Sequence, residues 1–177
     1  MKIKLFNSPI LRQKAVDITP MEYGTAQLNN IIESMKETMY REEGIGLAAN
    51  QIGYGVNVCV IDSSDPDEKG LRNKARVFIN AKITAASAES VKVEESCLSI
   101  PGVFAETERF KEVTVVYNTV DGHEVEEVLS GIEAVAMQHE VDHLAGKLYI
   151  DMLGPVKRNL VITKCQKFLK LKARGAI

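Results

Sequence analysis

Two histidines four positions apart are the residues of this chain best suited to chemistry. Residues 138–143 read QHEVDH, so Glu140 directly follows His139 and stands before His143. On a helix the two histidines lie on one face, where both imidazoles can bind one metal ion. Glu140 can then reach a water bound to that ion. The pattern indicates the metal site of a hydrolase; the alternative is a solvent-exposed helix face that carries two histidines by chance.

A catalytic metal ion usually has three protein ligands, so another residue must complete the pair. Residues 94–102 read EESCLSIPG and place Cys97 shortly after a predicted strand. A thiolate binds Zn²⁺ or Fe²⁺ well and loses its proton readily beside a metal. We expect Cys97 to be the third ligand, although without the histidines a buried structural thiol would be the better interpretation.

The histidines need a helix to bring them together, and the sequence around them predicts one. Ser130 and Glu133 have the spacing of a capping box, in which each side chain binds a backbone N–H at the helix start. Gly146 is a suitable residue to end the helix. Apolar residues recur at helical spacing between these positions: Ile132, Val135 and Ala136.

A segment rich in small residues is the next candidate for function. Residues 44–53 read GIGLAANQIG, and small side chains let a backbone pass close to another group. A phosphate-binding loop is not indicated, because no Gly-Lys-Ser/Thr follows and the Rossmann spacing of glycines is absent. The segment suits either a plain tight turn or a substrate-binding wall with Gln51 as its polar donor.

The rest of the chain predicts helices and antiparallel strands. An irregular arm precedes a helix over 21–42, which has an apolar stripe and ends before Gly44. Cys59 falls in a mostly buried strand and is most simply a core residue. The predicted strands cover 56–61, 76–80, 91–95, 113–118 and 124–129, with a hairpin turn at Asp121-Gly122 between the last two.

Length and composition favour one globular domain, residues 1–177. No apolar run approaches the length of a membrane span, and the N-terminus does not have the pattern of a signal peptide. The three cysteines are odd in number and widely spaced, which argues against a disulfide framework and indicates a cytoplasmic location. No feature indicates a membrane partner or sequence-specific binding of nucleic acid.

The C-terminal segment 152–177 contains no acidic residue and predicts a helix with apolar positions at Leu160, Val161, Phe168 and Leu171. Two interpretations stay open. The helix packs on the domain with its charges in water, or it docks to a phosphate-rich surface such as the ribosome by releasing counterions. Its basic residues are Lys157, Arg158, Lys164, Lys167, Lys170, Lys172 and Arg174.

Three motifs in this order closely resemble the peptide deformylase family. They are GIGLAANQ at 44–51, ESCLS at 95–99 and QHEVDH at 138–143, and the opening NSPILR at 7–12 is also similar. The resemblance covers nearly the whole chain. It implies an α+β fold in which a central helix with both histidines is surrounded by antiparallel β-sheets, with further helices towards the N- and C-termini.

The resemblance also implies an activity, a cofactor and a set of site residues. The reaction is removal of formate from the N-terminal formyl-methionine of new polypeptides. A divalent metal ion, Fe²⁺ in many bacterial members, is held by Cys97, His139 and His143, and Zn²⁺, Ni²⁺ or Co²⁺ also suit such ligands. The remaining residues implied are Glu140 as general acid and base, Gln51 and the backbone N–H of Leu98 for the oxyanion, Gly46 for a substrate backbone contact, and Ile45, Val93, Ile132, Val135 and Ala136 around the methionine side chain.

Two departures from the family pattern leave other functions open. Ser96 stands where the family usually has glycine, and it would be strained there if φ were positive. Phe104-Ala105 replaces an Arg-Gly pair, which puts contacts to the downstream peptide in question. The alternatives are a catalytically impaired deformylase-like protein and another HExxH metallohydrolase; the intact site residues argue against the first, and Cys97 against the second.

Overall fold

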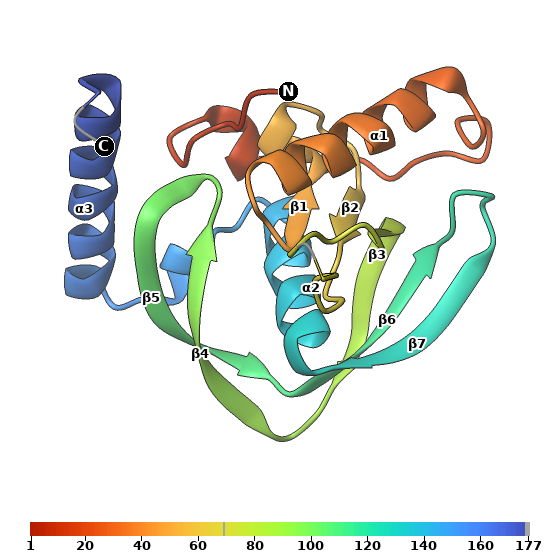
Figure 1. Cartoon of the computed structure of the whole chain (residues 1–177). Coiled ribbons are helices and arrows are strands. Elements are labelled where there is room, and N and C mark those ends of the chain that lie inside the picture. The colour runs from red at the N-terminus through yellow and green to blue at the C-terminus, as the bar shows by residue number, and fades with distance from the viewer. Residues whose placement is uncertain (69, 176–177) are drawn as a thin grey trace.

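The structure, a computed structural model, describes residues 1–68 and 70–175. It has the expected α+β fold, with two antiparallel sheets around a central helix (Figure 1). The helices are α1 (Ala26–Arg41), α2 (Gly131–Leu144) and α3 (Pro155–Ala173), with short 3-10 helices at Pro9–Arg12, Ala49–Ile52 and Tyr149–Met152. The strands are β1 (Gly46–Ala48), β2 (Val58–Ile61), β3 (Arg76–Ala86), β4 (Ser90–Cys97), β5 (Ile100–Phe110), β6 (Glu112–Asn118) and β7 (Glu124–Ser130).

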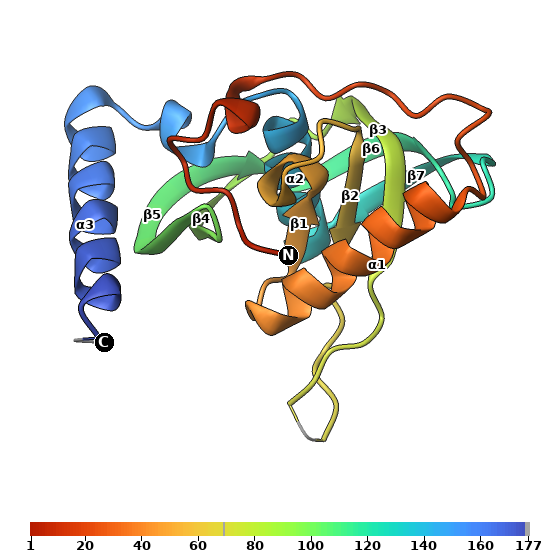
Figure 2. The ribbon, with the colours of Figure 1, turned by 90° about the horizontal axis from the view of Figure 1, so that it is seen from above.

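The larger sheet has the strand order β1-β2-β3-β6-β7, and β4 and β5 form a separate hairpin. Figures 1 and 2 show α1 and α2 on opposite sides of β1 and β2. Alternate residues of these strands therefore face different helices: Leu47 and Val58 pack towards α1, whereas Ala48 and Cys59 pack towards α2. Because both faces are covered, every residue of β2 is buried, as the sequence predicted.

Helix α2 begins after Ser130 and ends before Gly146, as predicted, but the capping box is wrong. The Ser130 side chain makes no cap hydrogen bond, and the Glu133 carboxylate instead accepts a 2.7 Å hydrogen bond from Arg76 of β3. Gly146 has φ +77°, and a Cβ there would lie 2.9 Å from the backbone of Arg12. Glycine is therefore needed at this end of α2 for its conformation and for the close approach of the N-terminal arm.

Strand β5 was not predicted from the sequence. Its residues alternate between buried and exposed, but the buried set includes Thr107 and Arg109. Polar residues on the buried face remove the period-2 hydrophobic pattern by which a strand is normally detected. The hairpin closes at a two-residue turn, where Cys97 of β4 is paired with Ile100 of β5.

The first long helix starts later than the sequence suggested. A turn covers residues 21–24, with Gly24 at φ +72°, and Thr25 caps α1 by accepting a 3.3 Å hydrogen bond from the Leu28 N–H. The predicted apolar stripe is confirmed as buried. Its members are Leu28, Ile31, Ile32, Met35 and Met39.

Helix α3 packs against β5 at the edge of the molecule (Figure 1). Val161 and Cys165 are buried, and the Phe168 ring lies directly over Gly102, where no Cβ could be accommodated. Leu160, expected on the buried stripe, is 57% exposed, so that prediction was wrong. None of the described helices is long and apolar enough to cross a membrane.

Candidate metal centre

The three predicted ligand residues lie together. The Cys97 Sγ is 3.2 Å from the His143 Nε2, which is 3.2 Å from the His139 Nε2. The helical spacing of α2 brings the two rings together, and the end of β4 brings the thiol to them. All three residues are at most 9% exposed.

A carboxylate behind His139 determines which ring nitrogen faces the ligand cluster. Glu95 Oε2 accepts a hydrogen bond from His139 Nδ1 at 2.7 Å, which leaves Nε2 free to bind a metal. Arg109 donates to both Glu95 oxygens, at 2.9 and 3.0 Å, and Thr107 also donates to this carboxylate. Burial acts to raise the pKa of Glu95, but the hydrogen bonds from His139 and Arg109 outweigh it and lower that pKa to about 2. The carboxylate is therefore ionised at neutral pH.

The donor set fits a divalent metal ion. Ligand nitrogens in a tetrahedral site are roughly 3.3 Å apart, as expected for metal–nitrogen distances of about 2.0–2.1 Å, and the separation here is similar. Burial lowers the pKa of His143 well below its usual value, so this ring is in the neutral form that binds metals. The carboxylate of Glu95 supplies negative charge to a buried cation, and Cys97 would supply more as the thiolate that forms when a thiol binds a metal.

Glu140 is placed beside the ligands by its position on α2. It is 3% exposed, and its Oε2 has no hydrogen-bond partner among the described residues. Burial raises its pKa to about 7, although the charge of His139 opposes this shift. Such an orphaned carboxylate oxygen is suited to a water or a substrate N–H, and its pKa is suited to proton transfer near neutral pH.

Gly46 of β1 makes room for this carboxylate. A Cβ on Gly46 would lie 2.5 Å from the Glu140 Oε1, so any other residue here would displace the acid. The Ile45 carbonyl accepts from Asp62 beyond β2, and backbone groups alternate in direction along a strand. The N–H and C=O of Gly46 therefore point to the free edge of β1, away from β2.

Gln51 lies at the same edge. Its Oε1 accepts a 2.8 Å hydrogen bond from the Ala48 N–H, which turns Nε2 towards the ligand cluster. That nitrogen is 3.2 Å from Ser99 Oγ and 3.7 Å from Cys97 Sγ. Leu98 occupies the turn directly after Cys97, so its backbone N–H belongs to the same corner of the site.

One cavity of about 680 Å³ unites nearly all the predicted site residues. Its lining includes Cys97, His139, Glu140 and Gln51, whereas His143 lies behind the wall as a nearly buried ligand. The other predicted residues in the lining are Leu98, Gly46, Ile45, Val93, Ile132, Val135 and Ala136. Four further carboxylates also line this cavity: Glu42, Glu43, Glu94 and Glu95.

The two departures from the family pattern have different positions. Ser96 lines the cavity and does not have a positive φ, so the expected source of strain is absent. Phe104 is 66% exposed and Ala105 is buried, and neither lines the cavity. The metal ligands are therefore undisturbed by both changes.

Sequence reasoning missed the residues that support the ligands. Glu95 was detectable, because it is two positions before Cys97 on a strand and so shares its face. Arg109, which holds Glu95 and donates to Asp142 at 2.6 Å, was not detectable. It belongs to the unpredicted strand β5.

The similarity of this chain to known proteins extends over nearly its whole length. The family model described as polypeptide deformylase matches residues 1–159. The chain is 41% identical to the peptide deformylase of Syntrophobacter fumaroxidans over 170 residues, 96% of each protein. The crystal structure of a peptide deformylase from Legionella pneumophila superposes with a TM-score of 0.87 at 35% identity, over 98% of this chain and 97% of that one. A Met-Ala-Ser-bound peptide deformylase from Acinetobacter baumannii matches with a TM-score of 0.80 at 31% identity, over 86% and 98% respectively.

Proposed function

This chain belongs to the peptide deformylase family, and from that membership and the site geometry we propose how its residues divide the reaction. The activity is that of the family, a metal-dependent hydrolysis that releases formate from formylated peptides. The Acinetobacter baumannii relative binds Met-Ala-Ser, a peptide that begins with methionine. We infer that the substrates of this chain are N-formyl-methionyl nascent peptides, met in the cytoplasm.

Cys97, His139 and His143 would hold the metal ion, with Glu95 orienting His139. When bound, a divalent ion supplies Lewis acidity that polarises a carbonyl and makes water more acidic. The native ion proposed is Fe²⁺, and the same donors suit Zn²⁺, Ni²⁺ or Co²⁺ in purified protein.

Glu140 is proposed to take a proton from the attacking water and to deliver it to the leaving amine. Its buried, unpartnered oxygen and its raised pKa support this role. Gln51 Nε2 and the Leu98 N–H would donate hydrogen bonds to the negative charge that develops on the formyl oxygen. Each such donor typically contributes about 3–4 kcal/mol to the transition state.

We propose that one part of the cavity lining binds the substrate backbone and another part binds the methionine side chain. Gly46 turns its N–H and C=O towards the cavity, where a substrate backbone could pair with them. Five residues would surround the methionine side chain: Ile45, Val93, Ile132, Val135 and Ala136. All five lie in the lining of the same cavity as Glu140.

The observation that carries the proposal is that the ligand atoms of Cys97, His139 and His143 lie within 4.8 Å of one another, in the same site as Glu140 and Gln51. The test is formate release from a formyl-Met peptide by protein loaded anaerobically with Fe²⁺, with Glu140→Ala as control. We expect rapid release by the wild type and a loss of at least about a hundredfold in kcat for the variant. No release from wild-type protein that demonstrably holds one metal ion would contradict the proposal.

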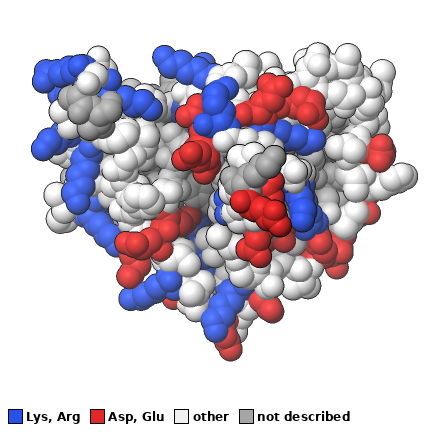
Figure 3. All heavy atoms as spheres, viewed as in Figure 1, with Lys and Arg blue, Asp and Glu red and all other residues white. Residues whose placement is uncertain are grey.

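Docking of α3 to the ribosome stays a prediction. Basic side chains run along this helix at the edge of the molecule (Figure 3), but Lys157 and Arg158 already contact Glu106 and Asp151 of the same chain. The same exposed lysines and arginines would be found on a helix whose polar face contacts only solvent. Co-sedimentation with ribosomes that weakens steeply with salt would support docking.

A further inference from the structure

Two buried hydrogen bonds determine how Gln51 presents its amide to the metal cavity. Its Oε1 accepts from the Ala48 N–H at 2.8 Å, and its Nε2 lies 3.2 Å from Ser99 Oγ. A backbone N–H only donates, so the first contact identifies the oxygen of the amide, and Nε2 is the donor to Ser99. Ser99 is 0% exposed and lies outside the described lining of the cavity. Any effect of its hydroxyl on a substrate must therefore pass through a neighbour such as Gln51.

The amide nitrogen of Gln51 carries two hydrogens, which point in different directions within the plane of the amide. One of them is bound by Ser99 Oγ. The other acceptor near Nε2 is Cys97 Sγ at 3.7 Å, a long contact to an atom that accepts weakly. A hydrogen held so loosely is available to an oxygen on which negative charge develops, because hydrogen bonds to charged acceptors are stronger.

The hydroxyl of Ser99 is a fixed anchor for this amide. Ser99 and Leu98 form the two-residue turn between β4 and β5, where Cys97 pairs with Ile100. The Ser99 carbonyl accepts from the Phe6 N–H at 2.9 Å, which ties the turn to the N-terminal arm. A buried turn held from both sides has the rigidity that a residue needs to orient another one.

Without this hydroxyl, the amide would have little to fix its direction. The last torsion of a glutamine side chain has a broad energy minimum, so the bond from Ala48 alone does not determine where Nε2 points. The sulfur would also compete for the amide, because Cys97 binds a metal as a thiolate and a charged sulfur is a better acceptor. Ser99 therefore keeps one hydrogen occupied and leaves the other directed to the cavity.

From these contacts we propose that Ser99 is a positioning residue for the reaction: it orients the Gln51 amide so that one Nε2 hydrogen faces the developing oxyanion. The inference rests on the role proposed above for Gln51. It gives the turn between β4 and β5 two tasks, since the Leu98 N–H would donate to the same oxygen directly. One short turn would thus set the position of both donors.

The first test observes the Gln51 side chain and requires no turnover. In ¹⁵N-labelled, Zn²⁺-loaded protein, we expect nuclear Overhauser effects between the Nε2 protons of Gln51 and the β protons of Ser99. The two Nε2 protons should have well-separated chemical shifts, and Ser99→Ala should bring those shifts together. Absence of the Overhauser effects in the wild type, or an unchanged Gln51 amide in Ser99→Ala, would overturn the proposal.

The second test is kinetic. Ser99→Ala should lower kcat about tenfold, less than the hundredfold or more that follows complete loss of an oxyanion donor. The KM for a formyl-Met peptide should stay within about twofold, because the affected hydrogen bond strengthens only in the transition state. The variant should still hold one metal ion. Wild-type kcat, or a loss of kcat that follows a loss of metal, would contradict the proposal.

A double-mutant cycle separates positioning from a general structural role. Gln51→Ala should lower kcat about a hundredfold. If Ser99 acts only through Gln51, then adding Ser99→Ala to that variant should cost less than about a further twofold. A full tenfold loss in the Gln51→Ala background would show that Ser99 acts elsewhere. Wild-type kcat in Gln51→Ala would refute both roles, whereas a wild type that releases no formate would refute the proposed activity and leave the NMR test to decide the position of Gln51.

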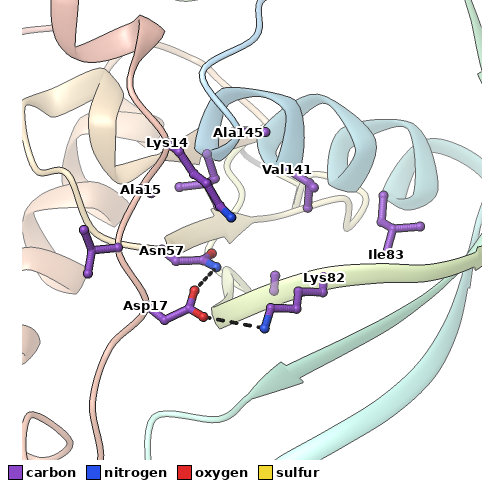
Figure 4. Close-up of a pocket in the computed structure, with 11 residues that line it drawn as sticks. Lys14, Ala15, Asp17, Asn57, Lys82, Ile83, Val141 and Ala145 are labelled. Carbon is purple, nitrogen blue, oxygen red and sulfur yellow. Dashed lines mark hydrogen bonds and ion pairs between the residues drawn. The ribbon is translucent and has the colours of Figure 1, made fainter.

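The matched control is Asn57→Ala. It also removes a side-chain hydrogen bond, from Asn57 Nδ2 to Asp17 Oδ1 at 2.7 Å, but in a groove between the N-terminal arm, α2 and β3 (Figure 4). The described residues that line this groove all differ from those of the metal cavity. Asn57→Ala should leave kcat and the Gln51 amide signals unchanged. A tenfold fall in kcat here would show that any lost hydrogen bond near α2 impairs the enzyme, and would refute a specific role for Ser99.

Discussion

At the scale of single residues, the proposed site depends on groups that neither bind the metal nor transfer a proton. Glu95 and Gly46 are two of them. The first orients His139 through a 2.7 Å hydrogen bond, and the second leaves space for the carboxylate of Glu140. Replacing Glu95 should therefore affect metal binding, whereas replacing Gly46 should affect catalysis. Metal affinity and kcat distinguish the two effects.

Replacing Glu95 with Gln should weaken metal binding. The amide can still fill the space and can accept from His139 through its oxygen, but the negative charge is lost. Changes in groups that hold a ligand histidine typically cost about 10–100-fold in metal affinity. A competition titration with a chromogenic chelator measures this loss, and Glu94→Gln, an exposed neighbour on β4, is the control. An affinity equal to wild type would show that Glu95 does not position His139.

Gly46→Ala should lower kcat without weakening metal binding, in contrast to the replacement of Glu95. The new methyl would lie 2.5 Å from Glu140 Oε1, so the acid must move while the three ligands stay in place. We expect full metal content and a fall in kcat of at least about tenfold, since a displacement near 1 Å can cost up to a hundredfold. The control is Gly55→Ala, where a Cβ meets no atom within 4 Å. Wild-type kcat in Gly46→Ala would contradict the packing described for Glu140.

The sequence predicted that the proposed ligands and Glu140 would lie together, but it did not predict the residues that hold them in place. His139, Glu140 and His143 are adjacent in one helix, and Cys97 stands in a recognisable motif. Arg109 reaches Glu95 from a strand whose buried face is partly polar. Its contact depends on the pairing of β4 with β5, and no local pattern specifies that partner.

At the scale of elements, local propensity located most helices and strands but misplaced several ends. The start of α1 was set five residues too early, because Thr25 caps the helix after a turn at Gly24. The start of α2 was correct for the wrong reason. The Ser130 side chain makes no cap hydrogen bond. Glu133, expected to be its partner in the capping box, instead accepts a hydrogen bond from Arg76 on β3. Tertiary ion pairs of this kind compete with local motifs and are not visible in the sequence around the helix.

A prediction at this scale concerns Asp62, which follows β2 and links the end of that strand to α1 and to the loop before β3. Its carboxylate accepts from Tyr40 of α1 at 2.8 Å, from the Lys74 N–H at 2.7 Å and from Ser64. Burial acts to raise the pKa of Asp62, but these hydrogen bonds outweigh it and the pKa is lowered. Asp62 therefore stabilises the fold above its unfolded-state pKa of about 3.9, and this contribution disappears as the pH falls through the lower folded-state value.

The measurement is urea unfolding of metal-free protein at pH 7 and pH 3.5. Asp62→Asn should lower the free energy of unfolding by about 1.5–3 kcal/mol at pH 7, the usual effect of hydrogen bonds to a charged group. The difference from wild type should shrink at pH 3.5. Asp65→Asn, in the exposed loop, is the control. A difference that stays constant with pH would exclude a contribution from the charge of Asp62.

At the scale of the whole molecule, the metal centre joins the two sheets. Cys97 comes from the β4–β5 hairpin, whereas His139 and His143 come from the helix that packs on the larger sheet. An ion shared by these residues therefore links parts of the chain that lie on opposite sides of α2. Because the unfolded chain does not preserve this arrangement, metal binding should stabilise the fold as a whole.

Removing the metal with a chelator should lower Tm. Metal present at a hundred times its Kd stabilises the native state by about 2.7 kcal/mol, which corresponds to roughly 5–10 °C in a protein of this size. Differential scanning calorimetry before and after chelation measures the change. Adding the ion back should restore Tm, and an equal Tm in metal-free and loaded protein would show that the centre does not bridge the fold.

The free edge of β1 has a consequence for the range of proteins that such an enzyme can process. A strand edge pairs with the N–H and C=O groups that every polypeptide has in common. The recognition proposed for Gly46 would therefore be indifferent to most of the amino acids that follow the first one. An enzyme that recognises its substrates in the proposed way could act on many different newborn chains, because it would read one side chain and otherwise mainly the repeating backbone.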